Sequence, residues 1–135
     1  MNIILDHIVL NVQDVERSVE FYTRVLQCEA ERLDQFRRGG VPFPSVRLNR
    51  DTIIDLFPPE MGKFEQGAAK RNNLNHFCIA LDRADWESLR GRLKDREIEL
   101  FRDGSINFGA KGDGISMYFR DPDGNEIEAR YYESR

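Results

Sequence analysis

The sequence is poor in cysteine and lacks long apolar runs, and each shortage excludes a class of protein. It has only two cysteines among 135 residues, Cys28 and Cys78, and they form no CxxC pair. We therefore expect two reduced thiols rather than a disulfide framework. No apolar run approaches the length of a membrane span, and no basic segment leads into an apolar one as in a secretory signal. These absences predict a cytoplasmic protein outside the membrane.

Basic charge is also in short supply. The chain has 20 Lys and Arg against 24 Asp and Glu, a net charge of -4, and the two signs are interleaved. A nucleic-acid-binding surface needs a clustered basic face, which this pattern does not provide. Apolar residues make up 40% of the chain and charged residues 33%, which is typical of one globular domain. We expect a small-molecule partner, neither nucleic acid nor membrane.

Histidine is equally scarce, and the two histidines occur in matching local patterns. His7 lies in LDHIVLNV at 5–12, and His76 lies in LNHFCIAL at 74–81. Each pattern predicts a strand that is followed by a polar break and a helix. The repeat has a period of about 69 residues, which is too long for a solenoid and indicates two fused modules.

Each half reads as strand, helix and three further strands. The first module, about 1–59, has expected elements at 3–12 (strand), 15–26 (helix with Asp14 as N-cap), 28–33, 45–48 and 52–57 (strands), with a turn region at 37–44. A connector covers 60–73. The second module, about 74–135, has expected elements at 74–81 (strand), 84–94 (helix), 98–101, 115–119 and 126–131 (strands), with a glycine-rich loop at 109–114. We predict an α+β fold of two βαβββ modules.

Period-two alternation assigns strand side chains to faces. In each module the apolar set faces the helix, which leaves four polar residues on the opposite faces: His7, Asp55, His76 and Glu128. If the two sheets curl toward each other, these faces line a shared cleft. Each residue alone has an ordinary explanation, as a structural histidine, a sheet-margin aspartate or part of a solvated charge stripe. The matched placement in both repeats favours a metal site.

The donor types fit a borderline divalent ion with open coordination positions. His7, His76 and Glu128 alone form the two-histidine, one-carboxylate triad of Fe(II) oxygenases. Addition of Asp55 gives a four-ligand site with two nitrogen and two oxygen donors, which suits Lewis-acid chemistry on a carbonyl. Both ligand sets remain open at this point, as does the ion: Zn, Mn, Fe, Ni or Co.

The chain resembles the vicinal oxygen chelate superfamily, which includes glyoxalase I, fosfomycin-resistance enzymes, extradiol dioxygenases and bleomycin-resistance proteins. The most specific matching segments are LDHIVLNV at 5–12, Phe21-Tyr22, and MYFRDPDGNEIE at 117–128. The resemblance implies paired βαβββ modules that form a curved mixed-sheet cup with the helices outside. It also implies one divalent metal on His7, Asp55, His76 and Glu128, and a homodimer, with the cup closed within one chain or across two.

The departures from the superfamily patterns rank the possible functions. An extradiol dioxygenase would need an acid-base histidine where this chain has Gly109, Ala110 and Lys111, so this alternative is disfavoured. A metal-free binding protein of the bleomycin-resistance type lacks the ligands that are intact here. We therefore predict a metal-dependent lyase, isomerase or epimerase of glyoxalase type that acts on an oxygen-bearing substrate.

Several further residues have expected roles in that reaction. Glu128 is expected to act as a base as well as a ligand, and Tyr118 to take part in catalysis beside it. Arg120 and Asn11 are expected to contact the substrate. Lys111, in the glycine-rich loop over one mouth of the cup, is expected to meet an anionic substrate there.

Overall fold

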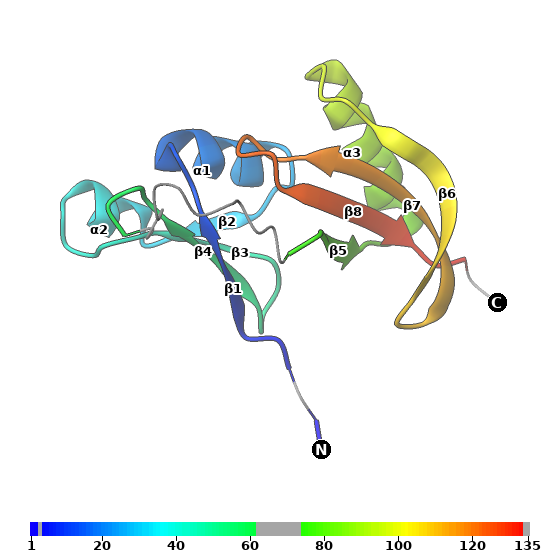
Figure 1. The fold of residues 1–135 in the computed structure, drawn as a ribbon, viewed down its shortest axis with the longest axis horizontal. Coiled ribbons are helices and arrows are strands. Elements are labelled where there is room, and N and C mark those ends of the chain that lie inside the picture. The colour runs from blue at the N-terminus through cyan, green and yellow to red at the C-terminus, as the bar shows by residue number, and fades with distance from the viewer. Residues whose placement is uncertain (3, 62–73, 134–135) are drawn as a thin grey trace. The chain divides into compact units, whose positions relative to one another are not determined.

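Two four-stranded mixed sheets form the framework of the computed structural model, which describes residues 1–2, 4–61 and 74–133. The chain divides into two compact units, Met1–Ala69 and Lys70–Arg135, and each contains one of the sheets (Figure 1). None of the described helices has the length and apolar character needed to cross a membrane.

The first unit follows the expected strand-helix-strand order, with one short helix added. Its elements are β1 (His7–Asn11), α1 (Val15–Arg24), β2 (Glu29–Glu31), α2 (Leu33–Arg37), β3 (Ser45–Arg47) and β4 (Ile53–Phe57). The strand order in the sheet is β1-β4-β3-β2. β1 runs parallel to β4, and the other neighbouring pairs are antiparallel. The two strands that are farthest apart in the module sequence are therefore direct neighbours.

The first helix begins at a capped end and covers one face of this sheet. The Asp14 side chain accepts a hydrogen bond from the Arg17 backbone N–H at 3.2 Å, as an N-cap does. Apolar residues recur at helical spacing in α1 and pack on β2, β3 and β4. Three sheet residues beneath the helix are completely buried: Val46, Ile54 and Leu56.

The second unit repeats this arrangement. Its elements are β5 (Phe77–Ala80), α3 (Arg83–Asp95), β6 (Phe101–Gly109), β7 (Gly112–Arg120) and β8 (Glu126–Tyr131). The strand order is β5-β8-β7-β6, and β5 runs parallel to β8. Asp82 caps α3 by accepting from the Asp85 N–H at 2.8 Å, and the Trp86 indole donates to the Ala129 carbonyl at 2.8 Å. The indole contact fixes α3 against β8.

The predicted α+β fold of two βαβββ units is confirmed, whereas several element boundaries are wrong. The strand that we expected at 98–101 begins only at Phe101 and continues to Gly109. The glycine-rich segment 109–114 is therefore not a loop but the end of a hairpin, in which β6 and β7 are joined through Ala110 and Lys111. Gly112, with φ +91°, permits this tight turn.

Unit 1 also departs from expectation at its edges. The strand expected at 28–33 is shorter, because α2 begins at Leu33. This helix has five residues, none of them buried, so its sequence has no apolar periodicity that would predict a helix. The first strand covers His7–Asn11 rather than 3–12. Most of the predicted connector, 62–73, lies outside the described residues, so the module boundaries stay a prediction.

The two aspartate caps give a first testable prediction. Replacement of Asp14 or Asp82 by alanine removes the acceptor for one N-terminal backbone N–H, and each change is expected to lower the free energy of unfolding by about 1 kcal/mol. Urea unfolding at a constant slope measures the loss. Asp14→Asn and Asp82→Asn keep an acceptor and should remain close to the wild type. An alanine variant as stable as its asparagine counterpart would contradict the capping role.

Candidate functional site

The parallel pair β1 and β4 brings His7 and Asp55 together in unit 1. Val9 is the register partner of Asp55, and His7 precedes Val9 by two residues on the same face. The His7 Nε2 atom lies 3.9 Å from Asp55 Oδ2. His7 is about half exposed, whereas Asp55 is buried. The carboxylate is therefore fixed in the sheet, and the imidazole lies at its surface.

The remaining polar atoms of this pair are held by neighbours. His7 Nδ1 lies 2.7 Å from Asp6 Oδ2, and the Ser45 hydroxyl donates to Asp55 Oδ1 at 2.6 Å. The hydrogen bond with Asp6 is the main reason why the pKa of His7 is raised above its ordinary value. A pocket of about 330 Å³ opens beside the pair, lined by His7, Glu31, Arg32, Phe43, Ser45, Arg47, Ile53 and Asp55.

Unit 2 carries the same arrangement at its own parallel strand pair. Cys78 is the register partner of Glu128, and His76 precedes Cys78 by two residues. His76 Nε2 lies 3.1 Å from Glu128 Oε1, and His76 Nδ1 lies 2.6 Å from Asn75 Oδ1. The Ser116 hydroxyl donates to the other carboxylate oxygen, Glu128 Oε2, at 2.6 Å.

The geometry of each pair suits a metal ligand set. In both units an Asp or Asn oxygen lies within hydrogen-bond distance of the histidine Nδ1 atom, and Nε2 faces a carboxylate oxygen. A carboxylate and an unprotonated Nε2 can hold a cation between them. Metal-binding histidines have this outer hydrogen bond, which fixes the tautomer and the ring orientation. The residues that are present therefore fit a divalent ion.

Within the described residues, each unit brings one histidine Nε2 atom to one carboxylate. Among the described residues, no three His, Cys, Asp or Glu side chains come together to hold a metal. The structure thus brings His7 to Asp55 and His76 to Glu128, within their own units. The four-ligand set stays a prediction.

Glu128 is the most constrained carboxylate of the four candidates. It is 2% exposed, and Arg130, itself 4% exposed, donates to Glu128 Oε2 at 2.6 Å. Burial alone would raise the pKa of Glu128, but hydrogen bonds from Ser116, Arg130 and Tyr118 outweigh it and lower the pKa below its ordinary value. This carboxylate remains ionised and is a correspondingly weak base.

Tyr118 lies beside both members of the unit 2 pair. Its ring meets the His76 ring edge-on, with centroids 5.7 Å apart. Burial, with a further contribution from the hydrogen bond to Glu128, raises the pKa of Tyr118, so the phenol keeps its proton. The Asn107 amide also donates to the Tyr118 hydroxyl at 3.2 Å. Tyr118 can donate a hydrogen bond at the site but does not act as a base there.

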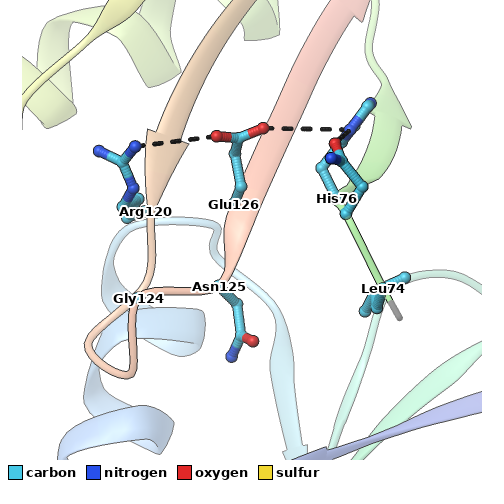
Figure 2. Close-up of a pocket in the computed structure, with 7 residues that line it drawn as sticks. Leu74, His76, Arg120, Gly124, Asn125 and Glu126 are labelled. Atoms are coloured by element: carbon cyan, nitrogen blue, oxygen red, sulfur yellow. Dashed lines mark hydrogen bonds and ion pairs between the residues drawn. The ribbon is translucent and has the colours of Figure 1, made fainter. Parts of the chain in front are cut away.

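A polar pocket of about 300 Å³ adjoins His76 (Figure 2). It is lined by Leu74, Asn75, His76, Arg120, Gly124, Asn125 and Glu126. Glu126 points between two of these residues, with its Oε2 atom 4.0 Å from His76 Nδ1 and its Oε1 atom 3.8 Å from Arg120 Nη2. The predicted substrate residue Arg120 therefore lies in the same pocket as the predicted ligand His76.

The other two predicted substrate residues are more distant from these pairs. Asn11 is exposed at the end of β1, on the face that carries His7. Lys111 lies in the turn before β7, whereas Arg120 ends that nine-residue strand. The length of β7 thus separates Lys111 from the pocket beside His76. The Lys111 backbone N–H donates to the Tyr132 hydroxyl at 3.3 Å.

Sequence reasoning missed the residues that orient the two pairs. Ser45 and Ser116 occupy neighbouring strands in both units, and Asp6 and Asn75 directly precede the two histidines. The polar residue before each histidine was visible in the repeated pattern. The serines required the strand register, which the sequence does not state.

Comparisons with known proteins agree with this two-unit arrangement. A family model described as the Glyoxalase/Bleomycin resistance protein/Dioxygenase superfamily matches residues 4–129. A virulence protein of Salmonella typhimurium is 27% identical over 95% of this chain and 83% of its own. A metallothiol transferase of Staphylococcus haemolyticus is 27% identical over 92% of this chain and 80% of its own. The solved structure of an integron cassette protein from Vibrio cholerae has a TM-score of 0.76, with 28% identity and 98% coverage of both chains.

The contacts around Glu128 give a second prediction, for the metal-free protein. Ser116→Ala removes one of the hydrogen bonds that lower the pKa of Glu128, so this pKa should rise, as measured by carbon-13 NMR titration of the carboxyl group. Ionised Glu128 stabilises the fold above its unfolded-state pKa. That stabilisation is lost as the pH falls through the lower folded-state value, and in Ser116→Ala the loss should be smaller.

The matched control is Ser45→Ala. It removes the equivalent contact to Asp55 in unit 1 and should leave the pKa of Glu128 unchanged. If Ser116→Ala also leaves that pKa unchanged, Ser116 does not hold the ionised carboxylate.

Proposed function

The chain belongs to the Glyoxalase/Bleomycin resistance protein/Dioxygenase superfamily, and on that premise we propose that it is a metal-dependent enzyme acting on a small oxygen-bearing molecule. The observation that carries the proposal is the duplicated His–carboxylate–Ser arrangement, in which both histidine Nε2 atoms face a carboxylate oxygen. The same donor types, in the same relation to each other in both units, favour a shared binding role for the two histidines.

The relatives support an enzyme of this kind. The similarity to a metallothiol transferase extends over 92% of this chain. Glyoxalase-type isomerase, epimerase or lyase chemistry is the reaction class that we propose. A bound divalent ion would supply Lewis-acid polarisation of a substrate oxygen.

The surroundings of each residue suggest its role in the proposed reaction. We propose His7, Asp55, His76 and Glu128 as the metal ligands. The lowered pKa of Glu128 favours its role as a ligand over its expected role as a base. Tyr118 keeps its proton, so we propose it as the catalytic residue that donates a hydrogen bond to a substrate oxygen.

Substrate contacts are proposed for the residues that border these pairs. Arg120 lines the pocket beside His76, and Asn11 is exposed on the His7 face. Lys111 stays a prediction at the hairpin turn. The homodimer and the cytoplasmic location are likewise proposals.

Metal uptake is the decisive measurement. Protein dialysed against chelator and then offered Zn, Mn, Fe, Ni or Co should bind one ion per chain, as counted by elemental analysis. His7→Ala and His76→Ala should each lower the affinity at least about a hundredfold, because each removes a ligand rather than an outer hydrogen bond, which typically costs 10–100-fold. The melting temperature of the wild type should rise on metal binding, and that of these variants should not.

Glu126→Gln is the matched control for Glu128→Gln. Both residues lie on β8 with side chains on the same face, but only Glu128 faces His76 Nε2. Uptake should survive the first change and fall sharply with the second. A wild-type protein that takes up none of the five ions would contradict the enzyme proposal. Small-molecule binding that is indifferent to chelator would then identify a metal-free binding protein.

A further inference from the structure

Besides the two histidines, other residues recur at matching positions of the two modules, and some of them have a strained backbone. Among the described residues, the non-glycine positions with positive φ are Gln27 (+58°), Arg32 (+59°), Glu97 (+56°) and Arg102 (+47°). They form two pairs, each about 70 residues apart, which is the spacing of the module repeat. Residues other than glycine rarely adopt this left-handed backbone conformation.

One of these pairs has an ordinary explanation and the other does not. Gln27 and Glu97 follow the ends of α1 and α3, where left-handed residues commonly terminate helices. Arg32 precedes α2, and Arg102 lies in the irregular part of β6 between Phe101 and Ser105. Glycine would adopt both conformations without strain. Arginine in both modules therefore indicates a use for the side chain.

The two arginines make the same kind of contact, each with an aromatic ring. The Arg32 guanidinium lies over the Phe43 ring at 4.7 Å, and the Arg102 guanidinium lies over the Tyr118 ring at 4.1 Å. Arg32 also donates to the Phe43 carbonyl at 3.1 Å. An aromatic face orients a guanidinium without neutralising its charge.

Neither arginine has an acidic partner among the residues that the structure describes. In the pocket of about 330 Å³ beside His7, the other arginine, Arg47, is paired with Glu31, which leaves Arg32 as a cation without a carboxylate. Arg32 is exposed and so accessible to a ligand.

In unit 2, Arg102 is connected to the candidate site through one tyrosine. The Arg102 guanidinium lies over the ring of Tyr118, and the Tyr118 hydroxyl is hydrogen-bonded to Glu128. Arg102 is exposed as well. Each unit thus has a histidine, a carboxylate and an oriented, unneutralised arginine.

We propose that Arg32 and Arg102 are anion-binding residues and that the substrate carries an oxyanionic group, a carboxylate or a phosphate. This inference rests on the proposed function and names its substrate class. The planar guanidinium matches the oxygens of both groups with two parallel hydrogen bonds. Arg32 and Arg102 are thereby specificity-determining residues, distinct from the metal ligands.

Inorganic phosphate is the probe. Its affinity for the metal-loaded protein is measured by isothermal titration at constant ionic strength, in the wild type, Arg32→Gly, Arg102→Gly and the double variant. Glycine relaxes the left-handed backbone, so these variants are expected to fold and to retain metal stoichiometry. The double variant should lose at least about tenfold in phosphate affinity, as expected for the loss of hydrogen bonds to a charged group.

Two control variants separate the side chain from strain and from net charge. Gln27→Gly relieves the same kind of backbone strain without a change at either arginine. Arg50→Ala removes a positive charge from unit 1 at a residue whose side chain is 92% exposed and paired with Asp51. Both should retain phosphate affinity within about twofold of the wild type, since neither changes a residue that holds the anion.

The outcomes distinguish this inference from the proposed function. Unchanged phosphate affinity in the double variant, with normal metal stoichiometry, overturns the anion role and leaves the metal enzyme standing. If the wild type takes up no metal, the proposed function fails. Phosphate binding that still depends on the two arginines would then support the anion site within a metal-free binding protein.

Discussion

The parallel pairing of the first and last strand in each unit is the constraint on which the candidate site depends. In a parallel ladder the register partner of a carboxylate and the residue two positions before that partner share one face. The histidine occupies this second position in both units, before Val9 in one and before Cys78 in the other. The same backbone geometry therefore brings each imidazole to its carboxylate, and the surrounding contacts only adjust how closely they approach.

The two pairs are nevertheless unequal. Glutamate reaches 3.1 Å from its histidine, whereas the shorter aspartate stays at 3.9 Å. Glu128 is also held by a buried arginine, whereas Asp55 accepts a side-chain hydrogen bond from Ser45. Unit 2 is thus the better-organised half of the proposed ligand set. In unit 1 the imidazole is half exposed and less closely tied to its carboxylate, so it has more freedom to adjust to an ion.

Period-two alternation and the internal repeat were sufficient to predict the fold class and the side-chain faces. Ile54 and Leu56 are buried against the helix while Asp55 faces the other way, because alternation along a strand is a local property. The serine contacts could not be predicted, because they depend on which residues of two strands lie opposite each other. The hairpin at 109–114 was missed for a related reason, since glycines that permit a tight turn look the same in sequence as glycines of a loop.

That hairpin has a part in the electrostatics of the site. A side chain at Gly109 would collide with the guanidinium of Arg130 and with the Tyr132 hydroxyl, and one at Gly114 would make a tight contact with the Tyr131 carbonyl. Arg130 also donates to the carbonyls of Asn107 and Phe108 in β6. The glycines therefore let β6 and β7 close over the arginine, and the buried arginine in turn keeps Glu128 ionised. A segment that resembles a surface loop in the sequence thus acts, through one buried cation, on the carboxylate that faces His76.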